Sequence, residues 1–243
     1  LCAAQEADDF LREVPEELPF MGTSCCPAWS VMAKKLFPEH ANCISMALTP
    51  MTLTARLIKH QHPNAKVVFI GPCAAKKLEA MRKSVRSEVD FVLTFEEMAG
   101  IFAAKHVDLT TIEEDPDGVN DASTDGRSFA VGGGVAKAVV NVIQHRYPGR
   151  EVKVTSSQGL RECRKMMQEA VAGKYPGYLL EGMACPGGCI AGAGTVQPPE
   201  KSRRMLEQYE ARAALDNPLD SEYMEDIELL YEDPENWDRV SRH

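Results

Sequence analysis

The sequence lacks the long apolar run that a membrane span requires, since no stretch approaches roughly 18 to 20 consecutive apolar residues. It also has little positive charge: 27 Lys and Arg stand against 36 Asp and Glu, a formal net charge of −9 at pH 7. Nucleic-acid binding depends on basic patches that neutralise phosphates, so this balance argues against such a partner. No secretory signal is visible, and we expect a cytoplasmic protein. Because the chain starts at Leu1 and not at Met, we also expect residues upstream, where any targeting signal would lie.

The composition is that of a globular protein, with 44% apolar and 26% charged residues in 243. Short apolar runs alternate with helical stretches, which predicts βαβ units and an α/β fold with parallel or mixed sheets flanked by helices. Turn-forming residues predict a surface loop over 115–127, and the polar end from 232 is expected to be loosely held. The predicted strands, all buried, are 66–70, 91–94, 152–155 and 178–180; the predicted helices are 4–14, 27–37, 50–60, 95–104, 135–146, 159–172 and 201–214.

Cysteines gather in three segments that also contain glycine or proline: TSCCPAW at 23–29, GPCAAKKLE at 71–79 and EGMACPGGCIAGAGT at 181–195. Pro27 fits the first position of a helix, so Cys26 would lie where the helix dipole favours a thiolate. The other two segments follow predicted strands, and the carboxyl ends of such strands form the binding crevices of open α/β sheets. A disulfide scaffold is not expected in a chain of this length.

Four cysteines are therefore candidate metal ligands. Four thiolates suit an iron–sulfur cube or a zinc ion. Zinc sites more often use two closely spaced cysteine pairs with less glycine, whereas glycine lets the backbone approach a bulky inorganic group. The surroundings favour iron–sulfur, although any one of these residues alone could be a buried apolar cysteine. The candidates are Cys26, Cys73, Cys185 and Cys189.

The three segments resemble, in order, the signature motifs of the FeFe hydrogenase catalytic domain. FAVGGGVAKAVV at 129–140 is similar to the glycine-rich segment before the third motif, and the likeness covers about 6–197. It implies a partial two-lobed catalytic domain at 1–200, followed by an acidic helical extension at 201–243. It also implies an H-cluster, in which a 4Fe–4S cube is joined to a two-iron subcluster with carbonyl, cyanide and bridging dithiolate ligands. The implied reaction is reversible reduction of protons to dihydrogen with ferredoxin or another electron carrier.

The resemblance also implies roles for single residues. Cys26, Cys73 and Cys185 match cube ligands, and Cys189 matches the ligand that bridges to the two-iron unit. Cys25 matches a cysteine that passes protons, which a thiol can both donate and accept. Without the resemblance it reads as a buried spacer.

Three further positions match residues around the two-iron unit. Lys76 matches a lysine that holds a cyanide ligand, and it lies one helical turn beyond Cys73. Its alternative reading is a solvated surface lysine. Met183 matches a methionine that packs over the two-iron unit, with a plain core residue as the alternative, and Pro72 belongs to the same implied pocket.

An implied proton route runs through a serine and two acidic residues. Ser45 matches the serine, and aligning the segment EADDFL selects Glu6 and Asp9, three residues apart on one helical face. A shift of one residue would select Gln5 and Asp8 instead. A helix that merely faces solvent with its acidic residues is the alternative.

Departures from the family pattern point to a divergent branch. Gly71 stands where Met usually precedes the Pro–Cys pair, Met51 replaces a common glutamine, and AGAGT at 191–195 replaces a glycine-rich run. The second hypothesis is therefore a non-catalytic relative that binds a 4Fe–4S cluster, either a sensory hydrogenase-like protein or an iron–sulfur assembly protein. The intact third motif and Cys25 favour the enzyme. Only 22 residues precede Thr23, so the missing N-terminal part of the catalytic domain is the expected partner.

Overall fold

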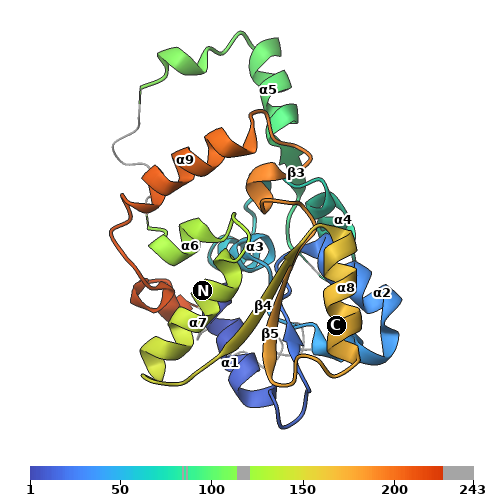
Figure 1. Ribbon diagram of the computed structural model, residues 1–243. Helices are drawn as coiled ribbons and strands as arrows, with labels where there is room; N and C mark the ends of the chain where they lie inside the picture. The colour runs from blue at the N-terminus through green and yellow to red at the C-terminus, as the bar shows by residue number, and fades with distance from the viewer. Residues whose placement is uncertain (84, 86, 114–120, 227–243) are drawn as a thin grey trace.

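Two parallel sheets organise the chain, which the computed structural model describes over residues 1–83, 85, 87–113 and 121–226 (Figure 1). The larger sheet has the order β1 (Met21–Gly22), β5 (Tyr178–Met183), β4 (Lys153–Gln158). The smaller one pairs β2 (Val68–Gly71) with β3 (Phe91–Thr94). All pairings between these strands are parallel, so the predicted α/β fold with helix-flanked parallel sheets is confirmed.

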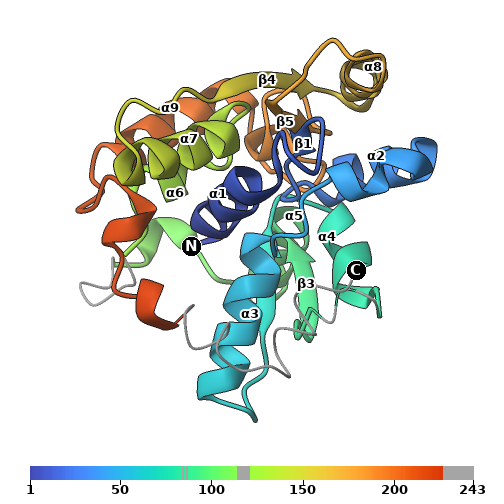
Figure 2. The same cartoon turned by 90° about the horizontal axis from the view of Figure 1, so that it is seen from below.

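Helices cover both faces of the larger sheet (Figures 1 and 2). On one side α7 (Gly134–Arg146) packs on β5 with α1 (Cys2–Glu13) beside it; on the other lie α2 (Pro27–Leu36) and α8 (Leu160–Val171). Because both faces are covered, β5 is buried at every position from Leu179 to Met183 and not at alternate positions. The core includes Trp29, Val139, Met167, Leu179 and Leu180, all fully buried.

The smaller sheet is much less covered. Around it lie α3 (Pro50–Gln61), α4 (Ala75–Met81) and α5 (Phe95–Ala104), and α5 buries none of its side chains. The prediction that the strands at 66–70 and 91–94 are buried is wrong, since Val68 and Ile70 are 46% exposed and Phe91 is 62% exposed. The physical reason is that the two strands and the three helices around them leave one side of this lobe without a covering layer. The prediction is also wrong for the strand at 152–155, because β4 is an edge strand of the larger sheet and none of its residues is fully buried.

The remaining described elements are short, apart from α9. They are α6 (Thr124–Ser128), α9 (Pro199–Glu210) and the 3₁₀ turns η1 (Pro38–Cys43), η2 (Leu109–Thr111), η3 (Cys189–Ala191) and η4 (Pro218–Asp220). None of the helices in the described ranges is long and apolar enough to cross a bilayer.

The predicted loop at 115–127 and the predicted helix at 201–214 need correction. Residues 115–120 lie outside the described part, and 124–127 are helical, with Asp125 and Arg127 buried. They are held there by tertiary contacts, because the Arg127 guanidinium lies 3.9 Å from the centre of the Tyr209 ring in α9. The helix itself spans Pro199–Glu210, and the end at 232–243 lies outside the described residues.

Candidate metal centre

Three strand ends carry the four candidate ligands. Cys26 is the N-cap residue of α2, four residues beyond β1, and Cys73 follows β2. Cys185 and Cys189 follow β5, and Cys189 opens the turn η3. Since β1 and β5 are hydrogen-bonded neighbours, and the Thr23 amide donates to the Leu180 carbonyl at 2.9 Å, the first and third cysteine segments leave the same sheet side by side.

The second segment reaches the third across the two sheets. The Gly194 amide donates to the Pro72 carbonyl at 2.9 Å, and a Cβ at Gly192 would lie only 2.4 Å from the same oxygen. The Ala184 amide also donates to the Cys26 sulfur at 3.4 Å. Backbone contact at this distance requires glycine, and it brings all three cysteine segments to one region.

The cysteine thiols influence one another electrostatically. Burial raises the pKa of the Cys189 thiol to about 12, and nearby Cys26 and Cys73 raise it further, while Lys76 lowers it. Burial and the same two cysteines also raise the pKa of Cys185. Four half-buried thiols with no carboxylate among them are a soft donor set that releases protons when a metal binds, so these residues fit an iron–sulfur cluster.

The spacing of these ligands bears on the kind of metal. Within the described ranges, no three His, Cys, Asp or Glu side chains gather closely enough to hold a single metal ion. A zinc ion about 2.3 Å from each sulfur would need the sulfurs within about 4 Å of each other. A cube binds one cysteine at each of its irons, so it accepts a wider arrangement.

Lys76 is buried, at 8% exposure, and does not extend into solvent. Its ammonium donates to the Cys25 carbonyl at 3.4 Å and pairs with Glu79 Oε2 at 2.7 Å. That oxygen has no hydrogen bond of good geometry, so the contact is an ion pair only. The neighbouring Lys77 instead pairs with the exposed Glu97. Of the two lysines, only Lys76 presents a desolvated cation near Cys25 and Cys189.

Cys25, Glu6 and Ser45 lie close to one another. Glu6 is 3% exposed, accepts a hydrogen bond from the Ser24 amide at 2.9 Å and is hydrogen-bonded to the Ser45 hydroxyl. Burial raises the pKa of Glu6 to about 7, and these two hydrogen bonds oppose the shift. Burial raises the pKa of the Cys25 thiol well above its usual value, and the Glu6 charge adds to that effect.

The other acidic positions on α1 have different surroundings. Asp9 is partly buried, pairs with Arg12 at 2.5 Å, and has its pKa raised chiefly by burial. Gln5 accepts from the Leu48 amide at 3.1 Å, and Asp8 pairs with Arg146. The structure thus brings Glu6 to Ser45, and the reading of α1 as merely solvent-facing is wrong for Glu6.

Met183 and Pro72, the two other residues predicted to border the two-iron unit, lie on different segments. Met183 ends β5 at 2% exposure but belongs to neither hydrophobic core cluster of the described residues, and neither does the similarly buried Met51. Pro72 contributes its carbonyl to the contact with Gly194.

Two residues escaped the sequence analysis. Glu181 in β5 is fully buried and accepts hydrogen bonds from the Gly133 and Ala136 amides. Gln158, at the end of β4, accepts from the Gly187 amide at 2.7 Å. The sequence did offer a signal for Glu181, which is a carboxylate next to an apolar strand. Because Glu is rarely buried without partners, such a residue indicates a specific interaction.

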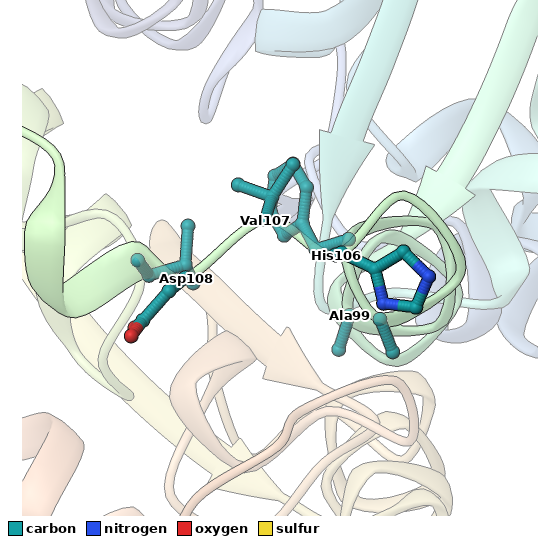
Figure 3. Close-up of a pocket in the computed structure, with 7 residues that line it drawn as sticks. Ala99, His106, Val107 and Asp108 are labelled. Atoms are coloured by element: carbon teal, nitrogen blue, oxygen red, sulfur yellow. The ribbon is translucent and has the colours of Figure 1, made fainter.

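A separate hollow of about 450 Å³ lies at the end of α5 (Figure 3). Mostly apolar residues line it, among them Ala99, Phe102 and Val107, together with His106 and Asp108. No cysteine borders it, so it is distinct from the metal centre.

Four thiols that follow the ends of parallel strands, two of them in a glycine-rich loop, are typical of the iron–sulfur class of proteins. Residues 1–193 match the family described as "Iron only hydrogenase large subunit, C-terminal domain". The chain belongs to this family.

Relatives in the family include both hydrogenases and other proteins. The chain is 29% identical to the periplasmic [Fe] hydrogenase large subunit of Nitratidesulfovibrio vulgaris, over 78% of this chain and 55% of the relative. It is 25% identical to iron hydrogenase 1 of Clostridium pasteurianum (87% and 44%) and 27% identical to cytosolic iron-sulfur assembly component 3 of Bos taurus (90% and 56%). The chain thus spans about half the length of these relatives, and identity alone does not separate the two activities.

Solved structures share the fold. A variant of the apo [FeFe]-hydrogenase HydA1 from Chlamydomonas reinhardtii superposes with a TM-score of 0.71 at 20% identity, over 96% of this chain and 77% of that one. A structure from a study of [FeFe]-hydrogenase inactivation by oxygen gives 0.68 at 21% identity, over 96% and 75%.

Proposed function

We propose that this chain is the catalytic region of an iron hydrogenase, which interconverts protons and dihydrogen with electrons from a ferredoxin-type carrier. The observation that carries the proposal is that four half-buried thiols and the buried Lys76 all lie just beyond the ends of three strands, in segments that contact one another. A zinc protein needs no such cation beside its thiolates. The likeness to a cytosolic iron-sulfur assembly component supports a cytoplasmic location.

The donor set fits an H-cluster. Cys26, Cys73 and Cys185 would hold a 4Fe–4S cube, and Cys189 would hold it and bridge to the two-iron subcluster with carbonyl, cyanide and dithiolate ligands. When bound, this group supplies the redox chemistry. The chain contributes position and charge: Glu79 and the Cys25 carbonyl restrain the Lys76 ammonium, which would donate to an anionic ligand such as cyanide.

Proton movement falls to the chain's own side chains. Cys25 would exchange a proton with the metal unit, and Glu6, with a pKa of about 7, can take up and release protons near neutral pH. The Ser45 hydroxyl is hydrogen-bonded to Glu6 and extends the route, while Asp9 would serve its outer end. Met183 and Pro72 would border the two-iron unit.

The second candidate is a non-catalytic relative that binds only the cube. It is favoured by the 27% identity to an iron-sulfur assembly component and by Gly71 and Met51 at positions that differ from the hydrogenase pattern. Anaerobic metal analysis with infrared spectroscopy, after co-expression with hydrogenase maturation proteins, separates the two. Iron with carbonyl and cyanide bands supports the enzyme. Cube iron alone, without hydrogen evolution, supports the relative, and stoichiometric zinc would contradict both.

We also propose that the N-terminal part of the catalytic domain, which precedes the first cysteine motif in the family, is the partner that covers the smaller lobe. Among the described residues of 62–113, no apolar side chain is buried, so this lobe has no core of its own. We call its exposed apolar side chains the lobe surface, and the hollow in Figure 3 adjoins it. Parallel sheets need both faces covered, and a two-stranded sheet alone is marginally stable. The lobe surface consists of Val68, Ile70, Leu78, Met81, Phe91, Phe95, Ile101, Val107, Leu109 and Ile112.

Hydrogen exchange of the chain alone tests this partner. Amides of β2 and β3 are expected to exchange far faster than those of β4 and β5, because only the larger sheet has a core. Co-expression with the segment that precedes the first cysteine motif in the relatives should restore protection. The double change Ile70→Glu and Phe91→Glu should abolish that effect, whereas Val171→Glu, at an exposed apolar position on α8, should not. Equal protection of both sheets in the chain alone would remove the reason for a partner.

A further inference from the structure

Glu181 caps a helix to which it does not belong. Its Oε1 accepts from the Gly133 amide at 2.7 Å, and its Oε2 accepts from the Ala136 amide at 2.9 Å. The N-cap residue of α7 is Gly133, with φ of +90° and no side chain to offer. The first amides of a helix have no partner within it, and the dipole there favours an anion. The fully buried carboxylate of Glu181 therefore supplies what Gly133 cannot.

The capped segment touches the loop between Cys185 and Cys189. Val131 forms an antiparallel bridge with Gly188, and the Ile190 amide donates to the Ala130 carbonyl at 3.2 Å. A Cβ at Gly188 would lie 2.6 Å from the Ala130 carbonyl oxygen, so the two backbones are in direct contact. Displacing the segment before α7 must therefore move the ligand loop.

Gln158 ties the same two parts together from the neighbouring strand. Its Oε1 accepts from the Gly187 amide at 2.7 Å, and its amide group occupies the space where Gly132 has no side chain. The loop that carries Cys185 and Cys189 is thus held on one side by a glutamine and on the other by a segment that Glu181 anchors.

We propose that Glu181 is a positioning residue: by capping α7 it fixes the glycine-rich segment 130–134, which in turn sets the shape of the loop carrying Cys185 and Cys189. This rests on the proposed function in one respect, since that loop is taken to hold the cluster. The requirement is for a carboxylate, because two amides need two acceptor oxygens. A glutamine would keep one acceptor and turn its own N–H group toward the second donor.

Glu181→Gln and Glu181→Ala test the proposal in the chain without cofactor, with Asp125→Asn as the matched control. Asp125 is also buried and also contacts α7, through the Asn141 amide group at 2.8 Å. Hydrogen exchange should rise roughly tenfold or more at residues 130–136 and 186–190 in both Glu181 variants. Asp125→Asn should leave 186–190 unchanged. If Glu181→Ala does not fold, Glu181→Gln, of nearly equal volume, carries the test.

A second measurement separates positioning from general stability. After anaerobic reconstitution with ferrous iron and sulfide, Glu181→Gln should shift the electron paramagnetic resonance spectrum of the reduced cube, whereas Asp125→Asn should reproduce the wild-type spectrum. An unchanged ligand loop in the exchange experiment, or a uniform rise across the whole chain, would overturn the proposal. Failure of the wild type to bind any cube would count against the proposed function, while the exchange result would still decide the role of Glu181.

Discussion

The buried Glu6 makes the stability of this protein depend on pH in a way that one substitution can isolate. Glu6 is 3% exposed, and its oxygens accept from the Ser24 amide and meet the Ser45 hydroxyl. Burial disfavours the ionised form more than these bonds favour it, and the folded pKa is about 7 against an ordinary 4.5. A glutamine at position 6 would keep an oxygen that accepts from the Ser24 amide, but its side chain does not ionise.

The size and direction of the effect follow from proton linkage. Because the folded pKa is raised, the carboxyl contributes full stability below the unfolded pKa and loses it as the pH rises through 7. The rise in the pKa of Glu6 from 4.5 to about 7 corresponds to about 3 kcal/mol in total, and most of it, about 2 to 3 kcal/mol, falls between pH 5 and pH 8.5. Glu6→Gln should therefore gain about that much relative to wild type across this interval.

Urea denaturation of reduced, metal-free protein, measured anaerobically at several pH values from 5 to 8.5, gives the required free energies of unfolding. Glu17→Gln, at an exposed position beyond α1, controls for the loss of one negative charge. If the curves for Glu6→Gln and wild type run parallel over the whole interval, the carboxyl does not titrate near neutrality and the burial argument is wrong.

Three further changes test the site and the fold. Cys25→Ala should lower hydrogen turnover by roughly 100-fold or more at unchanged iron content, and normal turnover would refute the proton role. Cys189→Ala should remove the carbonyl and cyanide infrared bands; a variant that still evolves hydrogen normally would show that the bridge is assigned wrongly. Asp90→Asn should destabilise the chain at pH 7, because it loses ion pairs to Lys59 and Lys66 that hold the pKa of Asp90 well below its usual range. This difference should shrink only as the pH falls below about 4, and equal stability in urea at pH 7 would contradict it.

Helix boundaries were predictable where the sequence carries a local start signal. Pro27 and Pro50 begin α2 and α3, and Thr94 with Glu97 forms a capping box at the start of α5, as their residue types require. The strand β1 was not predicted, because the two residues Met21–Gly22 are too short to show a period. The helix α6 was predicted as a loop because TDGRS is rich in turn formers. The Ser123 side chain caps its start, and the contact of Arg127 with Tyr209 holds it in place.

The candidate site was predictable in part, because a sequence motif reports on local structure and not on partners that lie far away in the chain. Candidate ligand cysteines lie next to residues that favour a particular local conformation, such as Pro27 at a helix start and the glycines at 187 and 188 in a turn. The choice between Glu6 and Gln5 has no local signal, because both lie on the same helix and differ only in their distant partners, Ser24 and Leu48. Glu181 could not be assigned for the same reason, since its partners lie about 45 residues away in sequence.

The apolar strands of the smaller lobe explain why burial was predicted wrongly there. They also bear on how Cys73 is held near the other three candidate ligands. A run such as VVFI predicts burial in whatever assembly the protein works in, and the described residues supply no layer over it. Cys26, Cys185 and Cys189 follow strands of the sheet that has a complete core, whereas Cys73 follows β2 of the lobe without one. Cys73 is fixed near the others mainly by the contacts of Pro72 with Gly194 and of Lys76 with Cys25. A partner that covers the lobe surface would fix the position of Cys73. A cluster bound to Cys73 would in turn fix the smaller lobe in the position that the partner binds. Because both bindings stabilise the same arrangement of the two lobes, each must strengthen the other by the same factor.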